Sequence, residues 1–206
     1  MTPSRRWAAR LGALLTLAVV TASCRGQPGP ATLLHPAAER GGTYLAELAR
    51  WTRTALVPDR ADIALSLTAV YKSEAFRDAY LDEYAAAYRI PSEDLAVLRA
   101  EQHERARDFY EFYVLAYTAD YRLNDLAARD SIWRIFLELP DGTRLKPQAI
   151  ERLERRDPLL ASFYPVGDAW SRPLSIRFAR PAGEDPSVAA PRLVATGALG
   201  SLTLAW

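Results

Sequence analysis

The sequence predicts an α+β fold, in which an antiparallel β-sheet or sandwich carries a leading helix and a two-helix insertion after the first strand. Two stretches of different periodicity and one turn motif predict it. Apolar side chains recur at helical spacing in residues 39–56 and at every second position in 61–71. The motif Pro140-Asp141-Gly142 lies between two short apolar runs, as in a hairpin. Since no regular strand–helix–strand series appears, antiparallel strands are expected.

The leading helix is expected over residues 39–56, because one side of that segment is apolar and the other carries charged residues such as Glu47 and Arg50. Pro58 is expected to end it. Residues 61–71 then alternate in the two-residue repeat of a half-buried strand, and this is the clearest strand signal in the chain.

The insertion is expected to contain two helices, at 74–89 and from Ser92 to about residue 108. The Ser73 hydroxyl can cap the first helix, and Glu74 suits the positive end of its dipole. Pro91 separates the two helices because proline interrupts helical hydrogen bonding.

The second half of the chain is expected to consist mainly of strands. The run 109–118 could extend the preceding helix or form a strand with two apolar faces, and its aromatic residues favour the strand. The other expected elements are a polar loop at 119–130, strands at 131–139, 143–146, 174–178, 192–196 and 201–206, and a short helix within 150–164. With 61–71, these make about seven strands in one domain over 38–206.

The composition indicates a globular protein with no nucleic-acid partner. Half of the residues are hydrophobic and a quarter are charged. Loss of residues 1–23 would leave 23 basic and 25 acidic residues, which is far from the clustered basic surface that nucleic acids require. Lys72 and Lys146 are the only lysines, and every other base is arginine.

The chain begins with the pattern of a secretory signal. Arg5, Arg6 and Arg10 precede an apolar run over 11–20, with no acid among the first ten residues. This run is shorter than the roughly 20 apolar residues that a membrane-spanning helix needs. A retained transmembrane anchor is therefore not expected.

The signal ends on the only cysteine of the protein. Ala22 and Ser23 are small and come directly before Cys24. In these features the segment resembles a bacterial lipoprotein signal peptide with its lipobox, although Thr21 occupies a position where Leu is commoner. The alternative is an ordinary secretory peptide with a cysteine near its cleavage site.

The resemblance implies cleavage after Ser23, diacylglycerol on the Cys24 sulfur and acylation, for example with palmitate, of the new amino terminus. Several acyl chains are needed because a single chain holds a protein to a membrane only marginally. Residues 24–37 are rich in Pro and Gly and are expected to form a flexible tether. The expected location is the bacterial cell envelope, facing the periplasm, on the outer membrane in preference to the inner.

His103 is the candidate for catalysis, since it is the only histidine of the expected domain. A zinc-protease helix needs a second histidine four residues away, and none is present. Surface ion pairing with neighbouring charges is the favoured interpretation. A lipid-tethered hydrolase or metal-dependent enzyme that uses His103 stays open as an alternative.

Two other groups of residues are candidates for binding. The loop residues Asp120, Asn124, Asp125 and Asp130 offer oxygen ligands for a metal, but their spacing is not that of a calcium loop, and turns use the same residue types. An aromatic stripe at helical spacing, defined as Phe76, Tyr80, Tyr84 and Tyr88, could line a ligand groove. A core role is favoured for this aromatic stripe.

The sequence therefore predicts a lipid-anchored envelope protein that is a non-enzymatic binding or structural module, with no cofactor. Its expected partners are the membrane, through the acyl chains on Cys24, and another envelope protein. A small-ligand-binding lipoprotein with a groove near the aromatic stripe is the other alternative.

Overall fold

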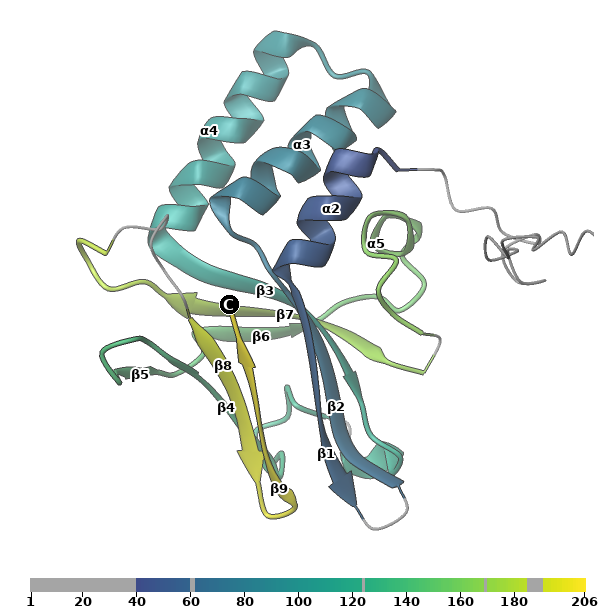
Figure 1. The fold of residues 1–206 in the computed structure, drawn as a ribbon, viewed down its shortest axis with the longest axis vertical. Coiled ribbons are helices and arrows are strands. Elements are labelled where there is room, and N and C mark those ends of the chain that lie inside the picture. The colour runs from purple at the N-terminus through teal and green to yellow at the C-terminus, as the bar shows by residue number, and fades with distance from the viewer. Residues whose placement is uncertain (1–39, 60–61, 124, 169, 185–190) are drawn as a thin grey trace, which may run out of the picture. The chain divides into compact units, whose positions relative to one another are not determined.

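The computed structural model describes residues 40–59, 62–123, 125–168, 170–184 and 191–206. Its first half contains both helices and strands, and its second half is mostly strands (Figure 1). In chain order they are α2 (Gly42–Trp51), β1 (Thr52–Asp59), β2 (Asp62–Tyr71), α3 (Glu74–Tyr88), α4 (Ser92–Asp108), β3 (Phe109–Tyr117), the 3-10 turn η1 (Tyr121–Leu123), β4 (Trp133–Glu138), β5 (Arg144–Leu145), β6 (Ala149–Arg152), α5 (Pro158–Phe163), β7 (Arg172–Ala179), β8 (Arg192–Gly197) and β9 (Gly200–Ala205). The predicted α+β class, with antiparallel sheets and a leading helix, is confirmed.

The strands form two antiparallel sheets. Sheet A has five strands in the order β1-β2-β3-β7-β6, and sheet B has four in the order β5-β4-β8-β9. The inward-facing side chains of both sheets form one buried apolar cluster, which includes Leu67, Phe112, Leu137 and Leu204. This arrangement follows from strands with alternating burial, each of which buries one face against the other sheet.

The helices cover the outer face of sheet A (Figure 1). A second apolar cluster joins α2, α3 and α5 to that face, and Tyr113 and Leu115 of β3 lie within it. Strand β3 is therefore buried on both faces, which is why its sequence FYEFYVLAY does not alternate between apolar and polar residues. The prediction of a strand over this ambiguous run is confirmed.

The leading helix is shorter than expected. It ends at Trp51, and Thr52–Asp59, which was expected to complete the helix, forms β1. The physical reason is pairing, because Thr52 through Val57 lie in register with β2, from Val70 back to Leu65. Pro58 is tolerated since β1 is an edge strand. The two-helix insertion consequently follows the second strand of the fold.

A further strand lies where a loop was expected. Residues 149–152 pair with β7 as β6, and α5 then occupies 158–163. The Asp157 side chain accepts a hydrogen bond from the Leu159 amide and caps this short helix. A strand of four residues carries too little periodicity to be read from the sequence.

The two sheets meet differently along their two margins. On one margin, Arg53 of β1 donates from Nε to the Ala205 carbonyl oxygen of β9 at 2.9 Å, and the Trp206 indole donates to the Trp51 carbonyl oxygen at 2.6 Å. On the other margin, none of the described backbone pairings joins β6 to β4 or β5. We call this second margin the open seam.

Candidate functional site

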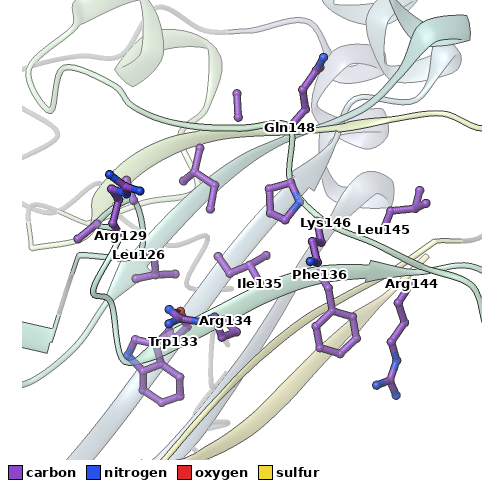
Figure 2. A pocket seen from close by; sticks show the side chains of 15 residues that line it. Leu126, Arg129, Trp133, Arg134, Ile135, Phe136, Arg144, Leu145, Lys146 and Gln148 are labelled. Carbon is purple, nitrogen blue, oxygen red and sulfur yellow. Dashed lines mark hydrogen bonds between the residues drawn. The ribbon is translucent and has the colours of Figure 1, made fainter.

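A cavity of about 790 Å³ lies at the open seam. Its lining comes from the loop 126–129, from β4 and from the segment 144–150 that leads from β5 into β6 (Figure 2). We call it the seam cavity. Its volume is within the range of about 300–1,000 Å³ that small-molecule sites occupy.

The seam stays open because β5 is very short. Only Leu137 and Glu138 of β4 pair with it, so Trp133 to Phe136 have no described strand partner on the side away from β8. The turn itself is well formed, with the Gly142 amide donating to the Leu139 carbonyl oxygen at 2.9 Å. Pro147 follows two residues after β5, and a proline cannot donate to a strand ladder. The chain therefore leaves sheet B and joins sheet A.

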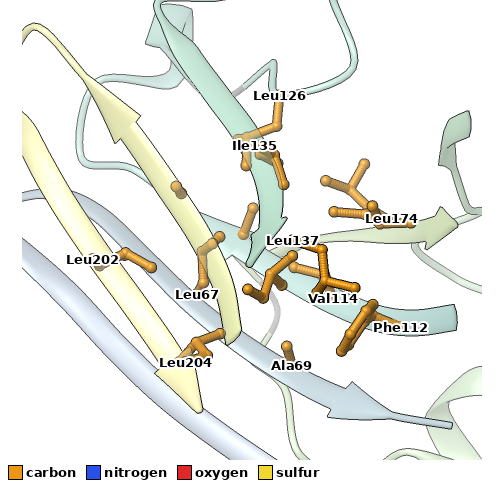
Figure 3. Close-up of a cluster of buried hydrophobic side chains, with 14 of the residues drawn as sticks. Leu67, Ala69, Phe112, Val114, Leu126, Ile135, Leu137, Leu174, Leu202 and Leu204 are labelled. Atoms are coloured by element: carbon orange, nitrogen blue, oxygen red, sulfur yellow. The ribbon is translucent and has the colours of Figure 1, made fainter. Parts of the chain in front are cut away.

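The inner wall of the seam cavity is part of the main core. Leu126, Trp133 and Ile135 line the cavity and are also members of the buried cluster between the sheets. Leu126 and Ile135 lie together in that cluster, beside Leu137 and Leu174 (Figure 3). Leu145 and Ile150 pack against the same cluster. An apolar ligand body in the cavity would therefore extend the hydrophobic core.

The polar part of the lining is basic. Arg129, Arg134, Arg144 and Lys146 belong to it, and none of the fifteen residues that line the cavity is an acid. The Arg144 guanidinium lies 4.8 Å from the centre of the Phe136 ring and its Nε is 3.3 Å from Glu138 Oε2. Arg134 donates to the Ser131 carbonyl oxygen at 2.6 Å.

Two of these bases have no internal partner. Arg129 and Lys146 are exposed, and no hydrogen bond or ion pair to either one occurs among the described residues. Both side chains are available to an acidic group of a ligand. An apolar cavity with basic groups at its edge can hold a molecule that has an apolar body and an anionic head.

The aromatic stripe is divided between core and surface. Phe76 is buried, Tyr80 and Tyr84 are half-buried against Phe163 of α5, and 56% of Tyr88 is exposed. Phe76 and Tyr80 line a second cavity, between the helices and sheet A, whereas Tyr84 and Tyr88 do not. The core interpretation therefore fits Phe76, and the groove interpretation fits Phe76 and Tyr80.

His103 lies between the two long helices, toward solvent. Its Nε2 is 2.8 Å from Asp78 Oδ1 on α3, and 37% of its side chain is exposed. Asp78 also accepts a hydrogen bond from Arg99 at 2.7 Å. His103 lines neither cavity. It belongs to a polar network with Asp78 and Arg99 on the surface of the helical insertion.

The acidic loop residues are not gathered around a common point. Asp120 binds the Arg122 guanidinium, with Oδ2 at 2.6 Å from Nη2, and this hydrogen bond lowers the pKa of Asp120. Asp125 pairs with Arg152, which likewise lowers its pKa. Asp130 is exposed, and Asn124 lies outside the described residues. No cluster of three or more His, Cys, Asp or Glu side chains suited to a metal occurs among the described residues.

The lipidation candidate Cys24, with the signal segment 1–23 and the tether 24–37, lies outside the described residues. Within the part of the chain that is described, no helix has the length and apolar character needed to cross a bilayer.

Sequence reasoning did not identify the seam cavity. Its basic residues come from a loop, from β4 and from the segment after β5, and the spacing between these positions has no pattern. Lys146 gave the only signal, as one of two lysines in a chain that otherwise uses arginine. The other lysine, Lys72, lines the second cavity.

Comparison with known proteins identifies no family. No family model matches the chain, and no curated protein matches it. Among solved structures, the chain is similar to a novel protein of unknown function from Burkholderia pseudomallei, at 13% sequence identity and a TM-score of 0.38. The similarity covers 79% of this chain and 81% of the other.

Proposed function

We propose that this protein is a lipid-anchored component of the bacterial cell envelope, and that its domain is a non-enzymatic module that binds an anionic amphiphile in the seam cavity. One observation carries the binding part of the proposal. An apolar cavity of about 790 Å³ is bordered by four basic side chains and by no acidic one. The sequence of residues 1–24, which ends at the sole cysteine, supports the anchor.

The apolar wall supplies affinity for a hydrocarbon body. Each Å² of apolar surface removed from water contributes about 25 cal/mol. Leu126, Ile135 and Ile150 provide such surface, and they are already held in place by the core. A preformed wall reduces the ordering cost of binding.

The basic edge supplies selectivity for an acidic head. A guanidinium binds a carboxylate or a phosphate through two parallel hydrogen bonds, and an ammonium adds a compact charge. Arg129 and Lys146 are the residues in position to do this, because they have no described partner to give up. A fatty acid or a lysophospholipid has the required chemistry.

Fluorescence titration with cis-parinaric acid tests the proposal. The full chain carrying Cys24→Ser, prepared without detergent, is expected to bind this fatty acid at a saturable site. The double variant Arg129→Gln/Lys146→Gln is expected to weaken binding at least about tenfold, because it removes the charge-assisted bonds to the head. Ala127→Trp, which adds bulk at the lining, is expected to abolish it.

Two controls make the result specific. Arg107→Gln removes one positive charge from α4, which contributes no residue to the seam cavity, and it should leave binding unchanged. Methyl parinarate, which lacks the acid, should bind more weakly than the acid to the unsubstituted cavity. Equal binding by the acid and the ester, or insensitivity to Ala127→Trp, would refute the seam cavity as an amphiphile site.

A further inference from the structure

A second cavity, of about 280 Å³, lies on the opposite side of sheet A from the seam cavity. Its walls come from α3, α4, the outer face of β3 and β7, and the segment around α5. We call it the helix-side cavity. It shares no lining residue with the seam cavity, so its properties are independent of the proposed function.

A buried ion cluster of one carboxylate and three bases adjoins the helix-side cavity, and two of its bases, Lys72 and Arg77, line the cavity. Glu111 is buried on the helix-facing side of β3, and its Oε2 is 2.9 Å from Nη2 of Arg77. Arg105 binds both oxygens of Glu111, at 3.0 and 3.1 Å, and Lys72 Nζ is 3.8 Å from Oε1. Burial raises the pKa of Glu111, but Lys72 and the two arginines outweigh that effect and hold the pKa at about 2. One carboxylate thus faces three bases. Burial lowers the pKa of Lys72, and the charge of Glu111 acts against that effect.

Lys72 has donors to spare at the cavity. Arg77 also lines it, but its guanidinium is occupied by Glu111, by Gln102 and by the Lys72 carbonyl oxygen. The Lys72 ammonium has one described partner, Glu111, at a distance longer than a hydrogen bond. Three N–H groups with one distant acceptor can bind an anion that enters the cavity.

Other residues that line the cavity are aromatic. Tyr113 and Tyr164 are only 5% and 8% exposed, and their stacked rings have centroids 4.3 Å apart. Neither hydroxyl is hydrogen-bonded to another described residue, and neither is among the buried polar atoms that lack a partner, so both reach accessible space. By contrast, the buried hydroxyls of Tyr44 and Tyr71 bond to Phe163 and Arg180.

These phenols are neutral donors at ordinary pH. Burial raises the pKa of Tyr113 to about 12, and it raises the pKa of Tyr164 well above its usual value. Phe76 and Tyr80 complete an apolar aromatic surface beside them. A planar ring fits such a surface, because aromatic pairs gain energy beyond the area they bury.

We infer that the helix-side cavity is a binding site for a small aromatic carboxylate. The carboxylate pairs with the Lys72 ammonium, and the ring lies among Phe76, Tyr80 and Tyr164. The hydroxyls of Tyr113 and Tyr164 donate to polar groups of the ligand. The volume of about 280 Å³ is just below the range of about 300–1,000 Å³ for small-molecule sites, so the ligand is expected to be small.

Isothermal titration of the full lipidated chain in mild detergent with 4-hydroxybenzoate tests this inference. Saturable binding is expected. Lys72→Gln should weaken it about tenfold or more, because it removes the charge that faces the carboxylate. Tyr164→Phe should weaken it by a smaller factor, because it removes a hydroxyl and keeps the ring.

The control variants separate binding from folding. Lys72→Arg keeps the positive charge beside Glu111 and should retain binding, and Arg107→Gln, which removes a charge that lines neither cavity, should have no effect. The uncharged 4-hydroxybenzyl alcohol should bind about tenfold more weakly than the acid. Thermal melting of each variant verifies that the protein titrated is folded.

Three outcomes would overturn the inference. The first is no saturable binding of 4-hydroxybenzoate, phenylacetate or indole-3-acetate by the folded chain. The second is equal binding by Lys72→Gln. The third is that inorganic phosphate displaces 4-hydroxybenzoate completely and binds as tightly as the aromatic acids do, which would identify a general anion site. None of these results bears on fatty-acid binding in the seam cavity.

Discussion

At the scale of single residues, the most informative one is Glu111. It is the only charged residue in β3. Its neighbours Tyr110 and Phe112 point into the core between the sheets, whereas Glu111 points toward the helices. Three bases from the helix-side elements surround it. Breaking a buried ion cluster by removing one partner leaves the other charges uncompensated, which is more costly than the net stabilisation of the intact cluster.

Glu111→Gln is expected to lower the free energy of unfolding near neutral pH by about 3 kcal/mol. The folded-state pKa is about 2 and the ordinary value is 4.5. The stabilisation is therefore present above pH 4.5 and is lost as the pH falls from 4.5 to 2. Denaturant unfolding at several pH values in this window should show the difference between wild type and variant shrinking toward low pH.

The matched control is Glu151→Gln, whose carboxylate pairs with Arg177 at 3.6 Å but is 60% exposed. It should change stability by less than about 1 kcal/mol, since exposed ion pairs contribute little. If Glu111→Gln behaves like this control, Glu111 does not hold the cluster together.

At the scale of elements, the two ends of helix α3 show what the local sequence determines. The Phe76 amide donates to the Ser73 hydroxyl at 3.2 Å, so the predicted cap is present. Arg89, directly after the last residue of α3, adopts a left-handed conformation with φ of 54°. A side chain with a Cβ is disfavoured there, and glycine is the usual residue.

Arg89→Gly is expected to stabilise the protein by about 0.5 kcal/mol, as relief of the left-handed strain exceeds the entropy cost of glycine in the unfolded chain. Arg89→Ala removes the same side chain but keeps the Cβ, so it should give no such gain. Thermal or chemical unfolding of the three proteins measures the difference. A destabilised Arg89→Gly would mean that the exposed arginine makes a contribution larger than the strain.

At the scale of the whole molecule, the folded part and the proposed anchor would make separate contributions. The domain closes one margin of its two sheets and leaves the other open, which creates the seam cavity. The proposed anchor would hold this domain at a membrane surface, where amphiphiles are concentrated. The chain has one cysteine, so an acylated Cys24 leaves no thiol for a disulfide, and the core alone must stabilise the fold.

Cys24→Ala is expected to abolish lipid attachment in a bacterial host. The wild type should be labelled by a palmitate analogue and should enter the detergent phase, and the variant should do neither, because the proposed acyl chains on Cys24 would provide the membrane affinity. Thr21→Leu, which restores the commoner lipobox residue, should keep labelling intact. Continued labelling of Cys24→Ala would exclude the lipoprotein hypothesis.

The sequence by itself determined the features that depend on neighbouring residues. Periodicity and turn motifs predicted the α+β class, the two-helix insertion, the strand at 109–118 and the hairpin at Pro140–Gly142, and the structure confirms them. The sequence also predicts a location in the cell envelope, through lipidation of Cys24, and this stays a prediction. These features are readable because capping, φ preference and apolar spacing act within a few residues.

Only the tertiary structure decided where the cavities lie and which residues line them. Thr52–Asp59 became a strand through its pairing with β2, and the seam exists because β5 and β6 join different sheets. Lys72 and Tyr164 line one cavity, and Trp133 and Lys146 line another, across chain separations that carry no sequence pattern. A binding site is a set of side chains assembled by packing, so its members are fixed by long-range contacts that the local sequence does not encode.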